Sequence, residues 1–370
     1  MSAPSHPAIV VGAGPAGLAT SRELKRRGVA HVVLERGEGV GQMWRGLYDS
    51  LRLHTGKHMS SLPGMALPAS VPLFPRREEF VSYLESYTET FGLPIRTSCA
   101  VVGVERAPDQ LRVRTSREEL TTHALVVATG ILSNPVLPEL EGRERFRGTV
   151  SHSVTYRRPE PFEGRRVLVV GVGNSGGEIG SELARAGVKV TLAVRSGAVV
   201  LPRQVLGVPI QYYSRLMAWL PRRGQRLVLA ATGWASSLLR GRPVLPRPPF
   251  SACPDVPLIG FELIEAIRAG RVSVRAAIAA FTPEGVRFAD GSEEPFDDVI
   301  LATGYRAALG PFEGVVHTDD CGFGRRRQRV RSVDEPRVFF VGHNYDARGG
   351  LFNIAQDAGK AAAMVAAALR

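Results

Sequence analysis

Two segments of the sequence repeat the spacing Gly-x-Gly-x-x-Gly. The first, Gly-Ala-Gly-Pro-Ala-Gly at 12–17, follows the apolar run 8–11, and helix-forming residues continue from it to Arg27. The second, Gly-Val-Gly-Asn-Ser-Gly at 171–176, follows the apolar run 166–170 and leads into another helix-forming stretch. A buried strand, such a loop and the first turn of a helix together present backbone N–H groups and a partial positive charge to phosphate oxygens. Both segments are therefore candidate pyrophosphate-binding loops.

The three glycines of each loop have different physical tasks. The first permits a tight turn, the second lets backbone N–H groups approach a pyrophosphate, and the third allows the helix to pack closely on the strand. The glycine spacing alone is a weak signal, whereas a complete strand–loop–helix–strand unit is a specific one. The alternative is a glycine-rich turn that binds no ligand.

The two units differ in the residue that follows their second strand. Glu35 lies 23 residues after Gly12, where a carboxylate can accept hydrogen bonds from ribose hydroxyls. Arg195 lies 24 residues after Gly171, where a guanidinium suits a 2′-phosphate. We therefore predict FAD in the first unit and NADPH, in preference to NADH, in the second. Alternatively, Arg195 is only a solvated charge. Arg203 is a weaker candidate for the phosphate.

Two further apolar runs end in Ala-Thr-Gly, at 128–130 before the second unit and at 302–304 after it. Apolar runs of this length are typical of buried parallel strands. We therefore predict an α/β fold with two Rossmann-like dinucleotide-binding domains, the NADPH domain inserted into the FAD domain. The predicted FAD-binding domain comprises 1–156 plus 288–370, and the predicted NADPH-binding domain comprises 157–287.

Two other regions bear on the substrate and the flavin. The segment 201–250 is rich in Pro, Leu, Trp and Arg, and short amphipathic helices are expected at 216–220 and 227–239. It could form a lid, a channel wall or a membrane-surface patch, or it could be a plain helical excursion. The stretch 353–369 is predicted to be a helix whose N-terminal dipole faces the flavin.

Composition narrows the class of protein. A length of 370 residues favours two domains. No stretch approaches the roughly 18 apolar residues of a membrane helix, and residues 1–7 lack the pattern of a secretory signal. We therefore expect a cytoplasmic enzyme without an integral membrane segment. The net charge of +12 comes from dispersed arginines. They suit anionic cofactors, and we expect no nucleic-acid binding.

The cysteines and the oligomeric state add less. The chain has three cysteines and no Cys-x-x-Cys pair, which argues against a dithiol relay and against a zinc-ribbon metal site. We expect no metal. No sequence pattern determines the oligomeric state, and a homodimer is compatible with the chain.

The segment 146–156 matches the fingerprint Phe-x-Gly-x-x-x-His-x-x-x-Tyr at all its fixed positions. Those positions are Phe146, Gly148, His152 and Tyr156. Between two dinucleotide loops, this pattern resembles the class B flavin-dependent monooxygenases, in the N-hydroxylating and flavin-containing branch. Gly-Gln-Met-Trp at 41–44 and Leu-His-Thr-Gly-Lys at 53–57 resemble further segments of that family. The resemblance covers nearly the whole chain and is strongest to plant-type indole-3-pyruvate monooxygenases and their bacterial relatives, because mammalian-type members have Asn where this chain has His54.

The resemblance implies a reaction cycle. NADPH reduces FAD, the reduced flavin and O2 form a C4a-hydroperoxyflavin, and a small organic substrate takes one oxygen atom. N- or S-oxygenation, Baeyer–Villiger insertion, hydroxylation and oxidative decarboxylation all remain open. The flavin does this chemistry, and the protein supplies placement and dryness. The alternatives are an NADPH-dependent flavin reductase that passes electrons to a protein partner, and a non-catalytic flavin-binding protein.

The resemblance also implies site residues. His54, near the isoalloxazine, and Asn174, near the nicotinamide or the peroxide, are the candidate catalytic residues. The candidate cofactor-binding residues are Gly12, Ala13, Gly14, Pro15, Ala16, Gly17, Glu35, Arg36, Gln42, Trp44, His54, Val102, Ala128, Thr129, Gly130, Gly171, Gly173, Asn174, Ser175, Gly176, Arg195, Ala302, Thr303, Gly304, Gly350 and Leu351. His152 either fixes the domain junction or has a mechanistic role, and Lys57 either orients an acidic substrate or is a surface lysine.

Overall fold

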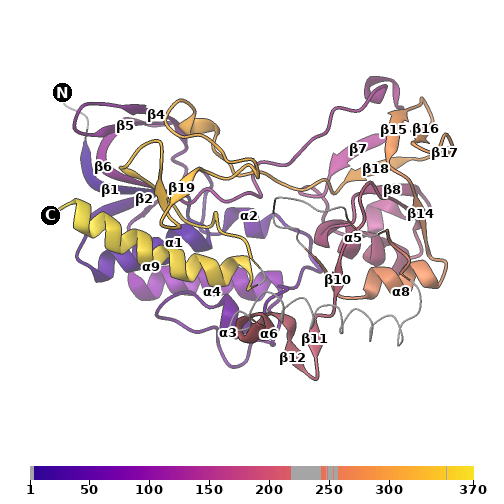
Figure 1. Ribbon diagram of the computed structural model, residues 1–370, viewed down its shortest axis with the longest axis horizontal. Coiled ribbons are helices and arrows are strands. Elements are labelled where there is room, and N and C mark those ends of the chain that lie inside the picture. The colour runs from indigo at the N-terminus through magenta and orange to yellow at the C-terminus, as the bar shows by residue number, and fades with distance from the viewer. Residues whose placement is uncertain (1–3, 218–242, 247, 249–252, 254–256, 347) are drawn as a thin grey trace. The chain divides into compact units, whose positions relative to one another are not determined.

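The computed structural model describes residues 4–217, 243–246, 248, 253, 257–346 and 348–370 (Figure 1). The chain forms two compact units. Unit 1 comprises Met1–Asn134 and Tyr305–Arg370, and unit 2 comprises Pro135–Gly304. Each unit contains a parallel sheet with helices, so the prediction of an α/β fold is confirmed. The helix expected at 227–239, and most of the one expected at 216–220, lie outside the described residues.

The boundaries of the units differ from the predicted ones, which were 156/157 and 287/288. Strand β18 (Asp298–Leu301) pairs in parallel with both β7 (Thr149–His152) and β8 (Arg166–Val170). Because β18 bonds to β8 and β7 bonds to β18, both strands belong to the sheet of unit 2. The chain changes units just after each Ala-Thr-Gly segment, and not at the glycine loop that follows it.

The main sheet of unit 1 has parallel strands in the order β3-β2-β1-β6-β21. They are β1 (Ser5–Val11), β2 (His31–Leu34), β3 (Ile95–Arg96), β6 (Glu119–Val127) and β21 (Val338–Phe340). Antiparallel strands extend it beyond β6 and β21. They are β4 (Val101–Arg106), β5 (Leu111–Thr115), β19 (Arg326–Arg327) and β20 (Arg331–Ser332).

Alternate residues of β1 pack on opposite faces of this sheet, as the period of a strand requires. Ala8 and Val10 belong to an apolar cluster shared with three helices. The helices are α1 (Pro15–Arg26), α4 (Arg77–Phe91) and α9 (Gly350–Ala368). Ile9 and Val11 belong to a second cluster formed with β4, β5 and the segment 307–316. Figure 1 shows α1 and α9 side by side on the helical face.

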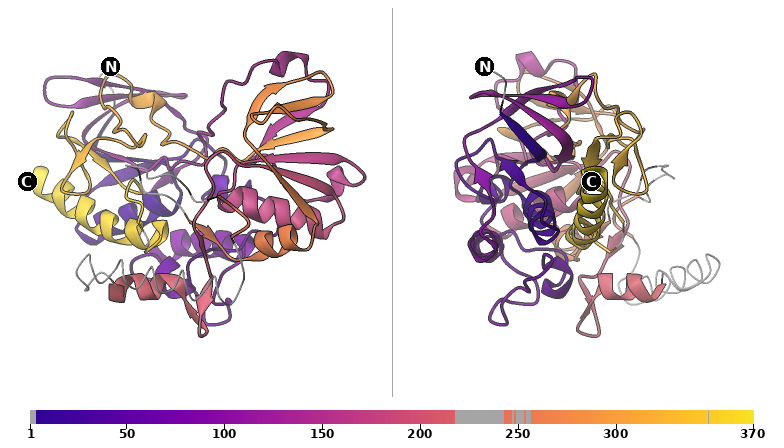
Figure 2. Two further views of the ribbon diagram at one scale, coloured as in Figure 1. Left: turned by 45° about the vertical axis from the view of Figure 1, so that its right-hand side comes forward. Right: turned by 90° about the vertical axis from the view of Figure 1, so that its left-hand side faces the viewer.

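Unit 2 repeats this plan around a sheet in the order β14-β9-β8-β18-β7, all of it parallel. Its remaining strands are β9 (Lys189–Ala193) and β14 (Val272–Arg275), and its helices include α5 (Asn174–Arg185) and α8 (Glu262–Arg268). An antiparallel sheet of β15 (Ile278–Phe281), β16 (Gly285–Phe288) and β17 (Glu293–Pro295) packs on one face. Its orange strands are visible in the left view of Figure 2.

Shorter elements connect these layers. In unit 1 they are α2 (Gln42–Arg45) and α3 (Lys57–Ser60), and in unit 2 they are β10 (Val200–Leu201), β11 (Gln204–Val205), β12 (Val208–Pro209), α6 (Ile210–Met217) and β13 (Leu258–Ile259). In the described part of the chain, none of the helices combines the length and the apolar composition needed to cross a lipid bilayer.

Both main sheets reverse their strand order at the strand that precedes a glycine loop. From β1 the chain goes to β2 and β3 on one side, whereas β6 and β21 lie on the other. From β8 it goes to β9 and β14, whereas β18 and β7 lie opposite. Open α/β sheets bind ligands beyond the carboxyl ends of their strands at such switch points. Both glycine loops occupy this position in their own unit.

Candidate functional site

In the first loop, the packing of the chain requires glycine at two of the three positions and permits a side chain at the third. Gly12 has φ +104°, and a Cβ there would lie 2.7 Å from the Ala128 carbonyl oxygen. A Cβ at Gly17 would lie 1.8 Å from the Gly12 carbonyl oxygen. Gly14 has φ −82°, and a Cβ there would meet nothing within 4 Å. Gly14 therefore leaves room for a group that is not part of the protein, as an approaching pyrophosphate requires.

The second loop has the same geometry. Gly171 has φ +105°, and a Cβ there would lie 2.5 Å from the Ala302 carbonyl oxygen. A Cβ at Gly176 would lie 2.1 Å from Gly171, whereas one at Gly173 would meet nothing within 4 Å. Within the described residues, no side chain caps the N-terminus of α1 or α5, so the N–H groups of their first turns remain available to phosphate oxygens.

Glu35 closes the first loop from the opposite side. Its carboxylate is buried and accepts the Ala13 N–H at 2.7 Å and the Gly37 N–H at 2.8 Å. An ionised carboxylate has about four lone-pair positions, so two remain for ribose hydroxyls. The two backbone bonds hold the group in a single orientation next to the loop.

The residue in unit 2 that corresponds to Glu35 is not Arg195. In both units the first glycine of the loop donates its N–H to the last residue of the second strand, Leu34 at 2.8 Å and Ala193 at 3.0 Å. The next residue is Glu35 in unit 1 and the buried Val194 in unit 2. The spacing of 24 against 23 residues had concealed this difference of one position. Unit 2 therefore has an apolar side chain, Val194, at the position where unit 1 has the carboxylate of Glu35.

Arg195 corresponds to Arg36, so both units carry an arginine directly after this position. Arg195 is exposed and makes no ion pair with any described residue. Arg203, the weaker candidate, donates to Glu178 at 3.3 Å and lies 3.8 Å from Glu262. Its charge is therefore already compensated, whereas that of Arg195 is available to an anion.

Two contacts connect segments that were predicted to lie near the flavin. The Gly41 N–H donates to the Ala13 carbonyl oxygen at 3.0 Å, which ties the start of α2 to the loop. A Cβ at Gly349, which precedes α9, would lie 2.4 Å from Thr55. The start of α9 therefore packs against the segment that contains His54. The predicted residues on these converging segments are Gln42, Trp44, His54, Gly350 and Leu351.

Three of the residues singled out in unit 1 have contacts or positions that the sequence did not indicate. Trp44 packs edge-to-face on Phe80 with 4.7 Å between ring centroids. The Lys57 ammonium donates to the carbonyl oxygens of Ala69 at 2.9 Å and Val71 at 2.7 Å, so it fixes a neighbouring loop and is not an uncommitted surface lysine. Val102 lies at a β-bulge, and 54% of its surface is exposed.

The two Ala-Thr-Gly segments hold the points where the chain changes units. The Thr129 hydroxyl donates to the Ala308 carbonyl oxygen at 2.8 Å, and the Thr303 hydroxyl donates to the Val136 carbonyl oxygen at 2.5 Å. Each threonine hydroxyl thus donates its hydrogen bond to a backbone carbonyl oxygen of this chain. Their alanines, Ala128 and Ala302, supply the close carbonyls that require the first glycine of each loop.

The fingerprint residues build the edge of the second sheet. A Cβ at Gly148 would lie 2.4 Å from the Phe146 ring, which packs in the core of unit 2. His152 ends β7 and is buried, and burial lowers its pKa, so the ring is neutral near pH 7. The Tyr156 hydroxyl donates to Glu182 of α5 at 2.9 Å. These contacts favour the structural role of His152 over proton transfer.

Asn174 begins α5, and its side chain has a fixed orientation. Its carbonyl oxygen accepts the Ile259 N–H at 2.8 Å. This bond leaves the amide nitrogen available to donate to a ligand at the second loop. Ser175 follows it in the first turn, half-buried.

One polar group near the first site was not predicted. Asp357 and Asn353 lie four residues apart on α9, and both are fully buried. A pair of polar residues at this spacing, on one face of a largely apolar helix, is the sequence signal that could have revealed them.

Comparison with known proteins agrees with this architecture. Residues 9–204 match the model of the pyridine nucleotide-disulphide oxidoreductase family. The chain is 37% identical over 360 residues to the indole-3-pyruvate monooxygenase YUCCA1 of Oryza sativa subsp. japonica. The matched region covers 94% of this chain and 86% of that protein. It is also similar to a solved flavin-containing monooxygenase of Stenotrophomonas maltophilia, with TM-score 0.78, 27% identity, and coverage of 98% of this chain and 99% of that one.

The fold by itself does not separate oxygenases from reductases. A bacillithiol disulfide reductase of Staphylococcus aureus has TM-score 0.72 over 97% of this chain and 98% of its own, but only 16% identity. The identity over nearly the full length to a curated monooxygenase is what distinguishes the two classes. The chain is therefore a flavoprotein monooxygenase and belongs to the class B flavin-dependent monooxygenase family.

Proposed function

We propose that unit 1 binds FAD, that unit 2 binds NADPH, and that the enzyme transfers one atom of O2 to a small organic substrate. The observation that carries this assignment is the contrast between two loops of equal backbone geometry. One ends at Glu35, and the other ends at Val194 followed by the uncompensated Arg195. A carboxylate accepts from free ribose hydroxyls and repels a 2′-phosphate, whereas a guanidinium attracts it.

The residues of unit 1 fit a flavin dinucleotide. The space over Gly14 and the free N–H groups of α1 would receive the pyrophosphate, and Glu35 would bind the adenosine ribose. His54, Gln42 and the start of α9 would surround the ring system and keep water from it. When bound, FAD supplies the redox and oxygen-activating chemistry that no side chain can provide.

The residues of unit 2 fit NADPH. The space over Gly173 and the first turn of α5 would receive its pyrophosphate, and Arg195 would pair with the 2′-phosphate. Asn174 would donate from its amide nitrogen, because its carbonyl oxygen is already bonded to Ile259. Its proposed task is to hold the nicotinamide end of the nucleotide.

For the substrate we propose a 2-oxo acid, which would lose its carboxyl group as CO2 on oxygenation. The support for this choice is the similarity to relatives named indole-3-pyruvate monooxygenases. N- or S-oxygenation, Baeyer–Villiger insertion and hydroxylation are the other reactions to test, because no described side chain selects among them. Lys57 is not expected to bind the carboxylate, since three backbone carbonyls already accept from its ammonium.

The test is the fate of the oxygen. The purified holoenzyme is supplied with NADPH, ¹⁸O₂ and indole-3-pyruvate, and the NADPH consumed, hydrogen peroxide formed and labelled acid produced are measured together. We expect one ¹⁸O atom in the product for each NADPH consumed. Quantitative release of the oxygen as hydrogen peroxide with this substrate, together with rapid reduction of an added electron carrier, would instead support the flavin reductase.

A further inference from the structure

The acid buried in α9 is bound by two side chains from other segments. The Asp357 side chain is 0% exposed. Its carboxylate accepts from Arg329 Nε at 3.0 Å and from Asn344 Nδ2 at 2.6 Å. A buried charge persists only where it is paired and hydrogen-bonded, and removing one partner is costly. The three side chains therefore behave as one cluster, which we call the Asp357 cluster.

The turn between β19 and β20, which carries Arg329 of the Asp357 cluster, has an unusual backbone. Gln328 has φ +50° and Arg329 has φ +71°, although neither is glycine. Each residue in this region costs on the order of 1–3 kcal/mol, and surrounding contacts must compensate. Asn344 Nδ2 also donates to the Arg329 carbonyl oxygen at 3.0 Å, so the same amide holds both the turn and the acid. This conformation directs Arg329 towards α9.

The cluster continues to the first turn of α9. Arg329 Nη2 donates to Asn353 Oδ1 at 3.3 Å, and Arg348 Nη2 donates to the same oxygen at 3.1 Å. Arg348 is in turn held by Asp346 in the loop before the helix. These contacts connect the strained turn with the loop and the helix start that pack against Thr55. The position of the α9 N-terminus thus depends on Arg329.

We propose that Arg329 and Asp357 are positioning residues that hold the N-terminus of α9 against the flavin and so set its reduction potential. This inference rests on the proposed binding of FAD in unit 1. A helix N-terminus carries a partial positive charge that acts only within about the first turn. A small displacement of that turn therefore weakens its stabilisation of the negative charge that the flavin gains on reduction.

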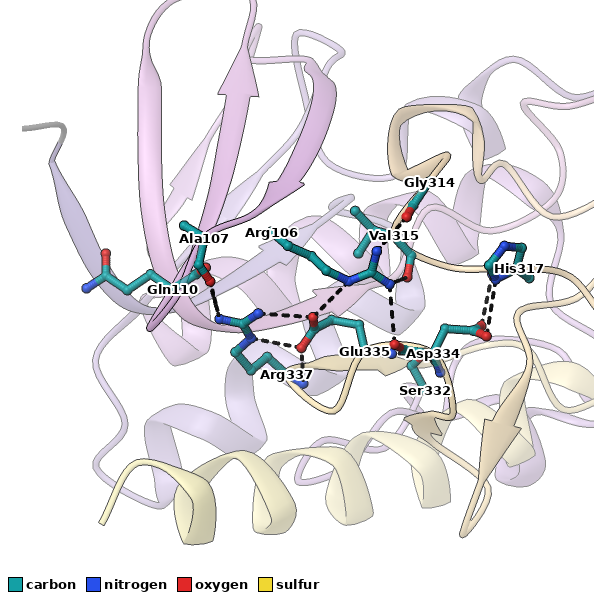
Figure 3. Close-up of polar contacts among 10 residues, drawn as sticks. All are labelled: Arg106, Ala107, Gln110, Gly314, Val315, His317, Ser332, Asp334, Glu335 and Arg337. Atoms are coloured by element: carbon teal, nitrogen blue, oxygen red, sulfur yellow. Dashed lines mark hydrogen bonds and ion pairs between the residues drawn. The ribbon is translucent and has the colours of Figure 1, made fainter.

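A second buried carboxylate in unit 1 provides a matched control (Figure 3). Glu335 accepts from Arg337 Nε at 2.8 Å and from Arg106 Nε at 3.2 Å, and its side chain is only 4% exposed. Arg106 also donates to the carbonyl oxygens of Gly314 and Val315. This cluster has the same chemistry but ties the β4–β5 hairpin to the segment before β21, and it includes no residue of α9.

The experiment compares Asp357→Asn, Arg329→Gln and Glu335→Gln in the full-length holoenzyme. The midpoint potential of the bound FAD is measured by equilibration with a reference dye, and the melting temperature of each FAD-free protein is measured alongside. We expect all three variants to have a lower melting temperature than the unaltered protein. Only Asp357→Asn and Arg329→Gln should bind reduced FAD about tenfold less tightly relative to oxidised FAD, a shift of about −30 mV for two electrons.

The signs of the shifts distinguish positioning from a simple charge effect. Removing a negative charge at 357 would raise the potential through space, and removing a positive charge at 329 would lower it. Positioning predicts that both variants lower it, because both release the helix start. Shifts of opposite sign, no shift, or an equal shift in Glu335→Gln overturn the inference. Arg329→Lys, a milder change at a side chain that is 35% exposed, should give a smaller shift of the same sign. Absence of FAD from the unaltered protein would instead overturn the proposed function.

Discussion

The two glycine loops have the same backbone conformation, but different residues follow the second strand of each unit. Their first glycines have φ +104° and +105°, and their second glycines have φ −82° and −71°. A pyrophosphate is the same group in both dinucleotides, so the same N–H geometry serves both. The difference begins after the second strand, where Glu35 faces Val194 in the equivalent position. Under the proposed function, the loop would therefore recognise the phosphate class and the end of the strand would recognise the ribose.

The largest effect is expected at the third glycine of each loop. Gly17→Ala and Gly176→Ala would place a methyl group within 1.8 and 2.1 Å of a backbone oxygen. Because backbone cannot move aside cheaply, each should lower the free energy of unfolding by about 3 kcal/mol or more. Urea unfolding of the ligand-free proteins measures this. Equal stability of variant and parent would show that the loops do not pack as described.

The second glycines should affect the ligands and leave folding intact. Gly14→Ala and Gly173→Ala add a methyl group that meets no protein atom, at φ values that alanine adopts readily. We expect the melting temperature of the ligand-free protein to be unchanged. We expect the ligand to bind roughly a hundredfold less tightly, a loss of about 3 kcal/mol in binding free energy. Titration calorimetry should find FAD affected only by the first change and NADPH only by the second. Loss of the same ligand in both variants would contradict the assignment of one nucleotide to each unit.

Equivalent acids on the two loop helices should respond differently to pH. Burial alone would raise the pKa of Glu23, but hydrogen bonds from Arg26, Arg27 and Arg22 hold it at about 2. The folded pKa is thus below the unfolded value, so the stabilisation is complete above about pH 4.5 and is lost as the pH falls towards 2. Glu23→Gln should lower the free energy of unfolding by about 2 kcal/mol at pH 7 and by little near pH 2.

The matched change on α5 is Glu182→Gln. Glu182 occupies the position of Glu23 but accepts only from the Tyr156 hydroxyl among the side-chain bonds described here. Glutamine keeps an acceptor for that hydroxyl, so we expect a loss of less than about 1 kcal/mol. Unfolding monitored from pH 2 to 7 compares the two variants. A pH-independent loss in Glu23→Gln would show that the arginines do not stabilise its ionised form.

A further set of changes concerns the choice of nucleotide. Arg195→Ala should weaken NADPH about tenfold, or 1.4 kcal/mol, and leave NADH unchanged. Arg203→Ala is the control, because its guanidinium is already paired with Glu178. Val194→Glu should act in the same direction by placing a carboxylate beside the 2′-phosphate. Binding titrations with both nucleotides measure the ratios, and an unaltered ratio in Arg195→Ala and Val194→Glu would refute the role of this strand end.

Much of the fold and of the candidate site could be predicted because the signals are local. The glycine loops follow from neighbouring residues, since a turn, a helix start and a close strand contact each restrict residue type within a few positions. The Phe146–Tyr156 fingerprint is equally local, and it indicates the family from the sequence alone. The family and the monooxygenase function are confirmed by the full-length identity to curated relatives.

Other features depend on segments far apart in the sequence. The boundaries of the two compact units differ from the predicted domain boundaries by about twenty residues, because β18 pairs in parallel with β8 and β7 pairs with β18. Lys57 could not be interpreted without the carbonyls of 69 and 71 folded over it. Hydrogen-bond partners across strands are not encoded in spacing along the chain.

The sequence by itself determined two glycine loops, the family and a difference in charge between the segments that follow the second strand of each unit. Only the tertiary structure decided that this difference lies at Glu35 and Val194, because strand register and not residue count makes two positions equivalent. Only the tertiary structure likewise brought Arg329 to Asp357, 28 residues away, because a buried charge must find its partner wherever the folded chain supplies one.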